Sequence, residues 1–500
     1  MPLPGGCRSR DRSPRVWASC VASVAAALLL AGPPASAQTL TEAFAYAYNN
    51  SPQLLAQRAA LRATDEGVPQ ALSNWRPTVN FTGSAGYSRG GSEVQGVNTK
   101  TNAQLGLQQP CVDASGNSGI GLTCTTPTQF ANFVSKQLDL KITQPVYRGG
   151  RTEAQTRQAI NTVAATRAQT LGVETTVFQA VAQSYLDVVR DQTLVEVSRN
   201  NEAVLRKQLD ATRDRFRVGE VTRTDVAQAE SSLAQATAQR IQAEGNLETS
   251  RSNFTRAVGH PPGRLLLPRE RPVLPATREE ALSLAANDNL NVISASFTEL
   301  AARDNVDFVR GGLLPTVSII GDLNRNFAPS FTLRNSRQDT ASVTAQLTMP
   351  LYEGGAIYSQ TRAAQQTAGQ RRSQVDDARR LAVQAATQAW ETLQANRAAI
   401  ASFGTAVRAA QIALEGTQQE ALVGSRTVLD VLIAEQQLFT TQSQLVTAQH
   451  DAALQEFILA AAIGRLIAPE LKLPVQLYDM ERHYKSVKDK WLGFGGGLKE

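Results

Sequence analysis

The chain has 500 residues, of which 42% are hydrophobic, 6% aromatic and 19% charged, and its formal net charge is +6. This length is enough for two or three ordinary domains. The modest charge, without a basic stripe interleaved with aromatic side chains, argues against a nucleic-acid-binding protein. No run of 18 apolar residues occurs after Ala37, so we predict no membrane-spanning helix beyond that point.

The first 37 residues have the features of a secretory signal peptide. Four arginines within residues 8–15 form a basic region, residues 21–31 an apolar core, and Ala35-Ser36-Ala37 a cleavage site of small residues. Cleavage after Ala37 would lower the net charge to +3. An N-terminal membrane anchor is the alternative. We predict that the protein is exported.

The remaining chain begins with a segment of helical composition, residues 40–71, in which apolar residues recur three or four positions apart. After Pro77 the period changes to two, as expected for strands, over residues 79–88 and again over residues 137–143. A second helical segment, residues 279–309, is likewise followed by alternating stretches at 317–323 and 343–349. Such strands, apolar on one face and polar on the other, fit a membrane barrel with a wet lumen or a sheet on a soluble core.

A membrane barrel would place two sets of side chains on opposite faces of these strands. Asp139 and Lys141 would face water. The side chains expected to face lipid are Val79, Phe81, Leu138, Leu140, Val317 and Leu347.

Two long segments without proline follow the strands, residues 149–216 and 354–421. As helices, each would be roughly 100 Å long, far beyond a globular helix. Each is followed by a Val-Gly pair, where Gly suits the left-handed end of a helix. The helix expected after each pair has apolar residues about seven apart, as in a coiled coil.

These elements form an internal duplication. The sequence TQPVYRGG at residues 143–150 returns as TMPLYEGG at residues 348–355, 205 residues later. Repeats fix the architecture of a chain. We predict a signal peptide (1–37), a first repeat (38–259), a proline-rich connector (260–276), a second repeat (277–470) and a C-terminal tail (471–500). The first repeat carries about 33 extra residues between Pro77 and Pro145.

Four strands cannot close a barrel, and an open sheet edge cannot face lipid. We therefore expect an oligomer whose strands combine. The duplicated order, the Pro-x-Tyr-x-Gly-Gly motifs and the Val-Gly turns resemble the TolC family of outer-membrane efflux proteins over residues 38–471.

The resemblance implies a mainly α protein with a membrane β-barrel in the outer membrane. Three copies would form a twelve-stranded barrel continuous with a long periplasmic α-helical barrel of coiled coils. Such a homotrimer would be the exit duct of a tripartite efflux pump or a type I secretion system. Its partners would be a periplasmic adaptor (a membrane fusion protein), an inner-membrane RND or ABC transporter, and outer-membrane lipid.

The resemblance also implies a gate at the periplasmic end. Arg426 corresponds to an arginine that locks one coiled coil to the next in the closed state, and Thr224 and Asp225 to its acceptors. Asp430 corresponds to a residue of the pore constriction, where a ring of carboxylates selects cations. The family pattern is incomplete here, because Ile433 stands in place of a second pore aspartate and Ala421 in place of a tyrosine near the lock.

The resemblance assigns the two Val-Gly turns to contact with the adaptor. The tips expected to dock it are Val218 and Gly219 in the first repeat, and Val423 and Gly424 in the second.

Two of the four cysteines, Cys111 and Cys124, follow the signal peptide and lie in the 33 extra residues. The resemblance places these residues in an extracellular loop. Because an exported protein passes an oxidising compartment, we expect a disulfide here, worth about 3 kcal/mol. Two free thiols are the alternative.

No catalytic or metal-binding pattern is present in the sequence. The three histidines, His260, His450 and His483, are widely separated, and no nucleophile elbow, HExxH motif or phosphate loop occurs. We predict neither enzyme activity nor a cofactor. The alternative function is a structural periplasmic coiled coil or trimeric adhesin without a conduit.

The C-terminal tail is basic, with Arg482, His483, Lys485, Lys488 and Lys490. We expect a solvated face here, with a binding site as the alternative. The segment 484–491 faintly resembles the ends of family members that serve type I protein secretion, whereas most members serve drug or metal efflux. The sequence leaves the cargo open.

Overall fold

The computed structural model describes residues 38–92, 95–97, 123–125, 129–266, 268, 271–328 and 336–494. The predicted signal peptide lies outside these residues. The chain forms two compact units. The helical unit consists of Met1–Arg62, Ala165–Ser296 and Gln374–Met480, and the sheet unit of Ala63–Ala164, Phe297–Ser373 and Glu481–Glu500. Each unit contains parts of both sequence repeats, so the repeats are not separate compact bodies.

Both predicted N-terminal helical segments are helical but interrupted. The break after α2 falls at Ser51, because the following Pro52 disfavours a helical conformation in the residue before it. In the second repeat the break falls at Asn289. The elements are α2 (Leu40–Asn50), α3 (Pro52–Asp65), α4 (Gly67–Leu72) and η1 (Ser73–Trp75), then α7 (Arg278–Asp288), α8 (Leu290–Arg310) and η2 (Gly311–Leu313).

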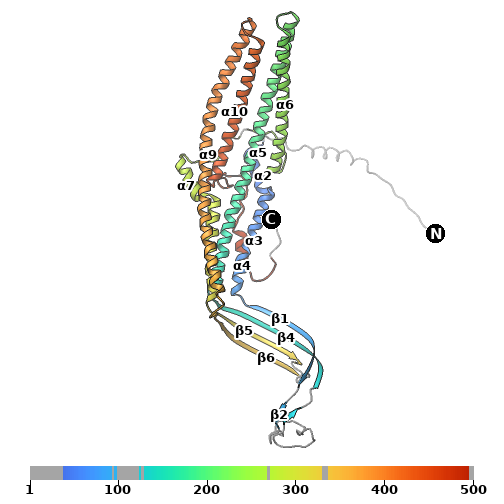
Figure 1. Cartoon of the computed structure of the whole chain (residues 1–500), viewed down its shortest axis with the longest axis vertical. Coiled ribbons are helices and arrows are strands. Elements are labelled where there is room, and N and C mark those ends of the chain that lie inside the picture. Colours follow the sequence, from blue (N-terminus) through green and yellow to red (C-terminus); the bar gives the residue numbers. More distant parts are fainter. Residues whose placement is uncertain are drawn as a thin grey trace, which may run out of the picture. The chain divides into compact units, whose positions relative to one another are not determined.

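The four main strands form one antiparallel sheet in the order β1-β4-β5-β6 (Figure 1). Each repeat contributes two neighbouring strands, and β4 and β5 join the repeats. The ladder between them is shifted at Pro145, which has no N–H to donate. The strands are β1 (Thr78–Ser92), β4 (Gln129–Arg148), β5 (Thr316–Phe327) and β6 (Arg337–Thr348).

The register confirms that the two predicted sets of side chains lie on opposite faces. Phe81 pairs with Leu140, Leu140 with Leu323, and Leu323 with Ala341 across the four strands. Because side chains alternate along a strand, this register defines one apolar face. That face carries all six residues expected to face lipid, whereas Asp139 and Lys141 lie on the polar face.

Two short strands, β2 (Gln95–Val97) and β3 (Thr123–Thr125), pair in the long insertion, with Gly96 opposite Cys124. Cys111 and the side chain of Cys124 lie outside the described residues, so the disulfide stays a prediction.

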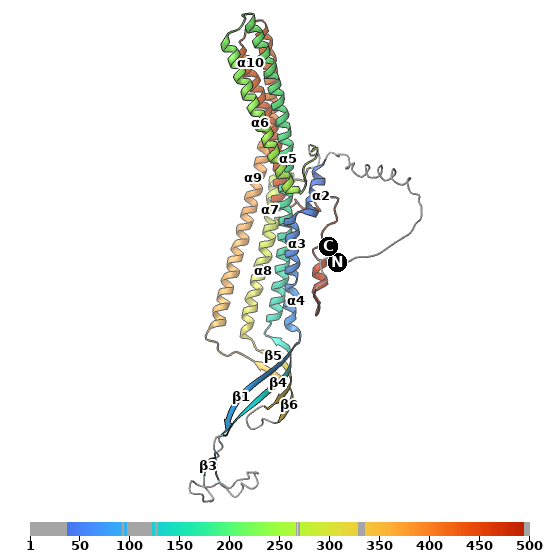
Figure 2. The same cartoon turned by 90° about the vertical axis from the view of Figure 1, so that its right-hand side faces the viewer.

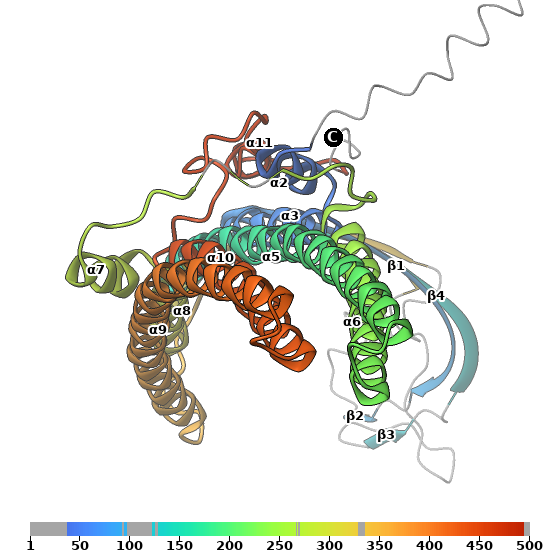
Figure 3. The same ribbon diagram turned by 90° about the horizontal axis from the view of Figure 1, so that it is seen from above.

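Long helices form where the sequence predicts them. In Figure 2, α6 returns beside α5 and α10 lies next to them. Figure 3 shows α9, α10, α5 and α6 of the helical unit in a curved row. No helix among the described residues is long and apolar enough to cross a membrane. These helices are α5 (Arg151–Arg217), α6 (Arg223–Val258), α9 (Ala356–Leu422) and α10 (Val428–Ala462).

The core of the helical unit packs α2 against α5, α6 and α10. Phe44 contacts Phe178 and Phe457, with ring centroids 5.2 and 6.0 Å apart. The fully buried Tyr185 lies within hydrogen-bonding distance of the carbonyls of Gln38 (2.9 Å) and Leu266 (2.7 Å). Burial raises the pKa of Tyr185 to about 12, so its hydroxyl stays protonated. This tyrosine ties the start of the first repeat to the connector.

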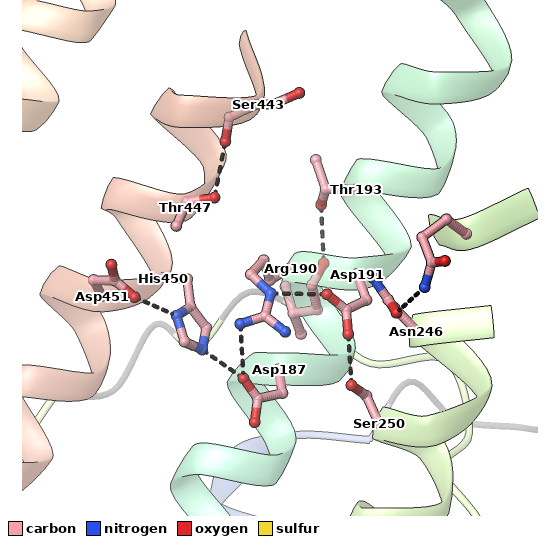
Figure 4. A network of polar contacts seen from close by, with 12 residues as sticks. Asp187, Arg190, Asp191, Thr193, Asn246, Ser250, Ser443, Thr447, His450 and Asp451 are labelled. Carbon is pink, nitrogen blue, oxygen red and sulfur yellow. Dashed lines mark hydrogen bonds and ion pairs between the residues drawn. The ribbon is translucent and has the colours of Figure 1, made fainter. Parts of the chain in front are cut away.

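A network of charged side chains connects α10, α5 and α6 near this core (Figure 4). His450 Nδ1 lies 2.9 Å from Asp451 Oδ1, and His450 Nε2 lies 3.0 Å from Asp187 Oδ1. Arg190 bridges Asp187 and Asp191, at 3.0 and 2.8 Å. Ser250 of α6 donates to the other oxygen of Asp191 at 2.5 Å.

The charged form of His450 suits both neighbouring carboxylates, because Nδ1 then donates to Asp451 while the ring charge pairs with Asp187. His450 is 8% exposed. Burial and the nearby Arg190 oppose the charge, but the carboxylates of Asp187 and Asp451 outweigh them and raise the pKa above 6.5. Protonated His450 therefore ties α10 to α5.

The first prediction concerns the apolar face of the sheet. Leu140→Arg places a charge at its centre, and an arginine facing lipid near mid-membrane costs about 2–4 kcal/mol of folding free energy. Gln137→Arg is the matched control, because Gln137 lies on the polar face of the same strand. Urea titrations of folding into lipid vesicles should show the loss only for Leu140→Arg. Equal stability of the two variants would contradict the assignment of faces.

The second prediction concerns pH. Since the pKa of His450 is higher in the folded chain, its stabilising contribution is complete below pH 6.5 and is lost as pH rises through the folded value. Thermal unfolding followed by circular dichroism should show a melting temperature that decreases as the pH is raised from roughly 6 to 9. In His450→Gln the fall should be smaller, because glutamine does not titrate at this position. An identical fall in both proteins would rule out this role.

Candidate functional site

The two Val-Gly turns share one backbone geometry. Gly219 has φ +83°, its N–H donates to the Phe216 carbonyl at 3.0 Å, and the Glu220 N–H donates to the Arg215 carbonyl at 2.9 Å. This is a Schellman motif, which ends a helix with a left-handed residue. The prediction of such an end is confirmed. The motif recurs 205 residues later, where Gly424 has φ +80° and donates to Ala421, and Ser425 donates to Glu420.

The helices after both turns begin with the same capping box. Thr222 accepts from the Asp225 N–H at 3.3 Å, and Asp225 Oδ2 accepts from the Thr222 N–H at 2.8 Å. Thr427 and Asp430 repeat this arrangement at 3.2 and 2.9 Å. Such boxes satisfy N–H groups that a helix start leaves unpaired. The Thr-x-x-Asp spacing could have revealed them from sequence, but sequence reasoning considered only gating for both aspartates.

The predicted contact between Arg426 and Asp225 is not formed within the chain. Arg426 Nε instead lies 2.8 Å from Glu420 Oε2, at the end of α9. Asp225 is engaged by its own capping box with Thr222, and Thr224 is exposed. The turn geometry explains the difference, because it folds Arg426 back toward the helix it has just left.

Asp430 is placed at the first turn of α10, partly exposed. The Thr427 N–H and hydroxyl, and then the charge of Arg426, lower the pKa of Asp430. A carboxylate held ionised in this way can attract cations, as the predicted constriction requires.

The tips present apolar side chains to solvent. Val218 is 71% exposed and Val423 81% exposed. A Cβ atom added at Gly219 or Gly424 would meet nothing within 4 Å. Ile433, at the place of the second family aspartate, is also exposed. The predicted docking residues are therefore accessible in the single chain.

Behind the tips, the two hairpins pack together through a small apolar cluster. Val428 and Leu432 of α10 are buried against side chains of α5 and α6. The residues contributed by the first repeat are Leu205, Leu209, Ala229 and Ala236. The cluster lies directly after Arg426 and Thr427 in sequence, so any movement of the second turn must disturb it.

A pair of equivalent positions near the turns differs between the repeats. In the first, Arg213 lies 2.7 Å from Glu230 in an exposed ion pair. In the second, 205 residues on, Gln418 donates to Glu435 at 3.0 Å, and Glu435 is 6% exposed. Burial raises the pKa of Glu435, and the hydrogen bond from Gln418 offsets this only in part. Sequence reasoning missed this pair, which the repeat offset could have exposed.

No group of three or more His, Cys, Asp or Glu side chains suited to a metal ion occurs in the part of the chain that the structure describes.

Known proteins similar to this chain point to one family. The family described as outer membrane efflux protein matches residues 45–260 and 281–465. Outer membrane efflux protein BepC of Brucella suis is 33% identical over 484 residues, covering 96% of this chain and 98% of its own length. Outer membrane protein TolC of Vibrio cholerae is 28% identical over 437 residues, covering 86% and 91%.

Solved structures show the same fold. The outer membrane protein VceC of Vibrio cholerae superposes with a TM-score of 0.68 at 20% identity, covering 85% of this chain and 96% of that one.

The fold that combines this sheet with paired long helical hairpins is thus shared with a protein of known structure. Relatives include proteins named as outer membrane efflux or outer membrane proteins and proteins named for protease secretion. The chain belongs to the outer membrane efflux protein family, and it is an outer-membrane channel of the efflux and type I secretion class, with a periplasmic helical extension.

Proposed function

We propose that three copies of this chain assemble into one exit duct. The observation that carries this proposal is the sheet with edges at β1 and β6. Exposed N–H and C=O groups at such edges are too costly in lipid, so a membrane sheet must close. Three copies supply twelve strands, a number known among closed membrane barrels. The polar face would then line the lumen.

The experiment that tests this assembly uses the full chain in detergent and in planar bilayers. Native mass measurement should give three chains per particle, and the reconstituted protein should conduct ions. A monomer, or a trimer without conductance, would favour the structural coiled coil over a conduit.

We further propose that the duct receives its cargo from an inner-membrane RND or ABC transporter through a periplasmic adaptor. The exposed Val218 and Val423 beside open glycines support the two turns as the docking tips. Small residues allow a partner backbone to approach closely. A conduit of this kind passes its cargo without a chemical step, so we propose no enzyme activity for it.

The structure modifies the proposed gate. Arg426 is paired with Glu420 in the single chain. To form the lock, it would have to leave Glu420 and bind Asp225 and Thr224 of another subunit. Asp225 keeps a second carboxylate oxygen beyond the one that caps its helix, and this oxygen is the acceptor we propose. Asp430 would form the constriction ring, as one carboxylate from each subunit.

The prediction for the tips separates docking from turn strain. Any side chain at Gly424 is strained at φ +80°, so Gly424→Ala tests the turn alone. Val423→Trp adds bulk at a position that is 81% exposed, without this strain. Transport and adaptor crosslinking should be lost in Val423→Trp, while trimers still reach the outer membrane. Normal crosslinking in Val423→Trp would place the docking surface elsewhere.

The prediction for the gate uses paired substitutions. Arg426→Ser should raise conductance in planar bilayers, since an exposed pair worth up to about 1 kcal/mol is repeated three times around the axis. Asp430→Asn removes the charge but keeps a capping acceptor, so it should weaken divalent-cation block without lowering the melting temperature.

Asp225→Asn is the matched control for Asp430→Asn, because both residues hold the same capping position. It should leave cation block unchanged, and it should raise conductance because Asp225 is the proposed acceptor of Arg426. Unaltered conductance in Arg426→Ser together with equal block in the two asparagine variants would assign the gate to other residues.

A further inference from the structure

The described part of the C-terminal tail is attached to the rest of the sheet unit. Within the sheet unit, α11 (Arg482–Val487) has Val487 buried. His483 Nδ1 lies 3.1 Å from Asp65 Oδ2, at the end of α3, and the Asp65 side chain is 1% exposed. The expected solvated face holds for Arg482 and Lys485, which are exposed, whereas His483 supplies a partner for a buried carboxylate.

A second attachment fixes the tail beside the start of β1. Arg76 Nη1 donates to the Lys490 carbonyl at 2.7 Å, and the Arg76 guanidinium lies 4.8 Å over the Trp491 ring. Arg76 stands two residues before Thr78, where β1 begins, and the exposed Val79 follows on the apolar face. The described part of the tail is thus held next to the point at which the first strand of the sheet begins.

At this position the tail exposes large apolar side chains. Trp491 is 65% exposed, Leu492 is 89% exposed, and Phe494 is fully exposed. Lys488 and Lys490 beside them are exposed as well. Aromatic residues and lysines combined with aliphatic side chains are typical of segments that lie at a membrane surface. A chain that docks its tail twice and still leaves these side chains in water needs a further partner for them.

We propose that residues 488–494 contact the periplasmic leaflet of the outer membrane and act as a peripheral anchor for the channel. Leu492 and Phe494 enter the acyl boundary, Trp491 lies at the headgroups, and Lys488 and Lys490 bind the phosphates of anionic phospholipid. A bilayer is the partner that fits, because the segment is pinned beside the start of β1, whose apolar face we expect to contact lipid. The anchor would fix the depth of the strands in the membrane.

The test uses the fluorescence of Trp491 in the full-length channel. Trp75→Phe and Trp390→Phe leave Trp491 as the single tryptophan once the segment containing Trp17 is removed. The protein is reconstituted in phosphatidylethanolamine and phosphatidylglycerol vesicles, with or without bromine on the acyl chains near the headgroup. Brominated lipid should quench Trp491. A control protein that keeps only Trp390, which packs in the helical unit, should not be quenched.

Substitutions of the tail then measure insertion. Leu492→Ser with Phe494→Ser should lower the inserted population roughly tenfold or more, since two large apolar groups return to water. Lys488→Gln should lower it about fivefold in anionic vesicles and have little effect in neutral ones. Absence of quenching would overturn the proposal. A blue-shifted Trp491 emission that brominated lipid does not quench would also overturn the proposal, because the tail would then lie against a protein surface.

Discussion

Backbone hydrogen bonding within the membrane is the constraint on which the rest of this structure depends. Neighbouring strands of the sheet are hydrogen-bonded to one another, but β1 and β6 lie at its two edges. Lipid offers no partner to an exposed N–H or carbonyl. A stable membrane form therefore requires further strands from other copies. The duplication fits this need, because each repeat supplies one pair of strands and one helical hairpin to the same assembly.

Duplication also explains why the two hairpin tips are built alike and yet differ in charge. The Schellman turn and the capping box depend on a few residues, Gly219 and Asp225 in one repeat and Gly424 and Asp430 in the other. Away from these positions the repeats have diverged. The first tip pairs Arg215 with Glu220 at 4.0 Å, whereas the second pairs Glu420 with Arg426. The reversed order places the basic member of the pair after the turn only in the second hairpin, where the proposed gate would use it.

The helices are fastened at two levels by different interactions. Near the tips, Val428 and Leu432 hold α10 against the first hairpin by apolar packing, which is not directional. Closer to the core, His450 and Asp187 fix α10 on α5 by directional contacts between charges. A hairpin held firmly at the core and loosely at the tip is suited to a movement confined to the tip. Buried Glu435 lies in the loosely held part, where protonation removes the cost of its burial.

The sequence by itself determined the elements that local chemistry controls. Strand alternation, proline-free helical stretches and the Val-Gly turns depend on neighbours a few residues apart, so residues such as Leu140, Lys141 and Gly424 could be assigned to faces and turns. The break at Ser51 also had a local signal in Pro52.

Tertiary structure decided the contacts between segments far apart in the chain. The charged network around His450 and the bond from Arg76 to the Lys490 carbonyl join groups whose separation in sequence carries no periodic pattern. Asp225 and Asp430 show the same division. The resemblance suggested a gate role for both aspartates. In the structure both carboxylates cap the start of a helix, because an unpaired N–H there bonds to the nearest carboxylate.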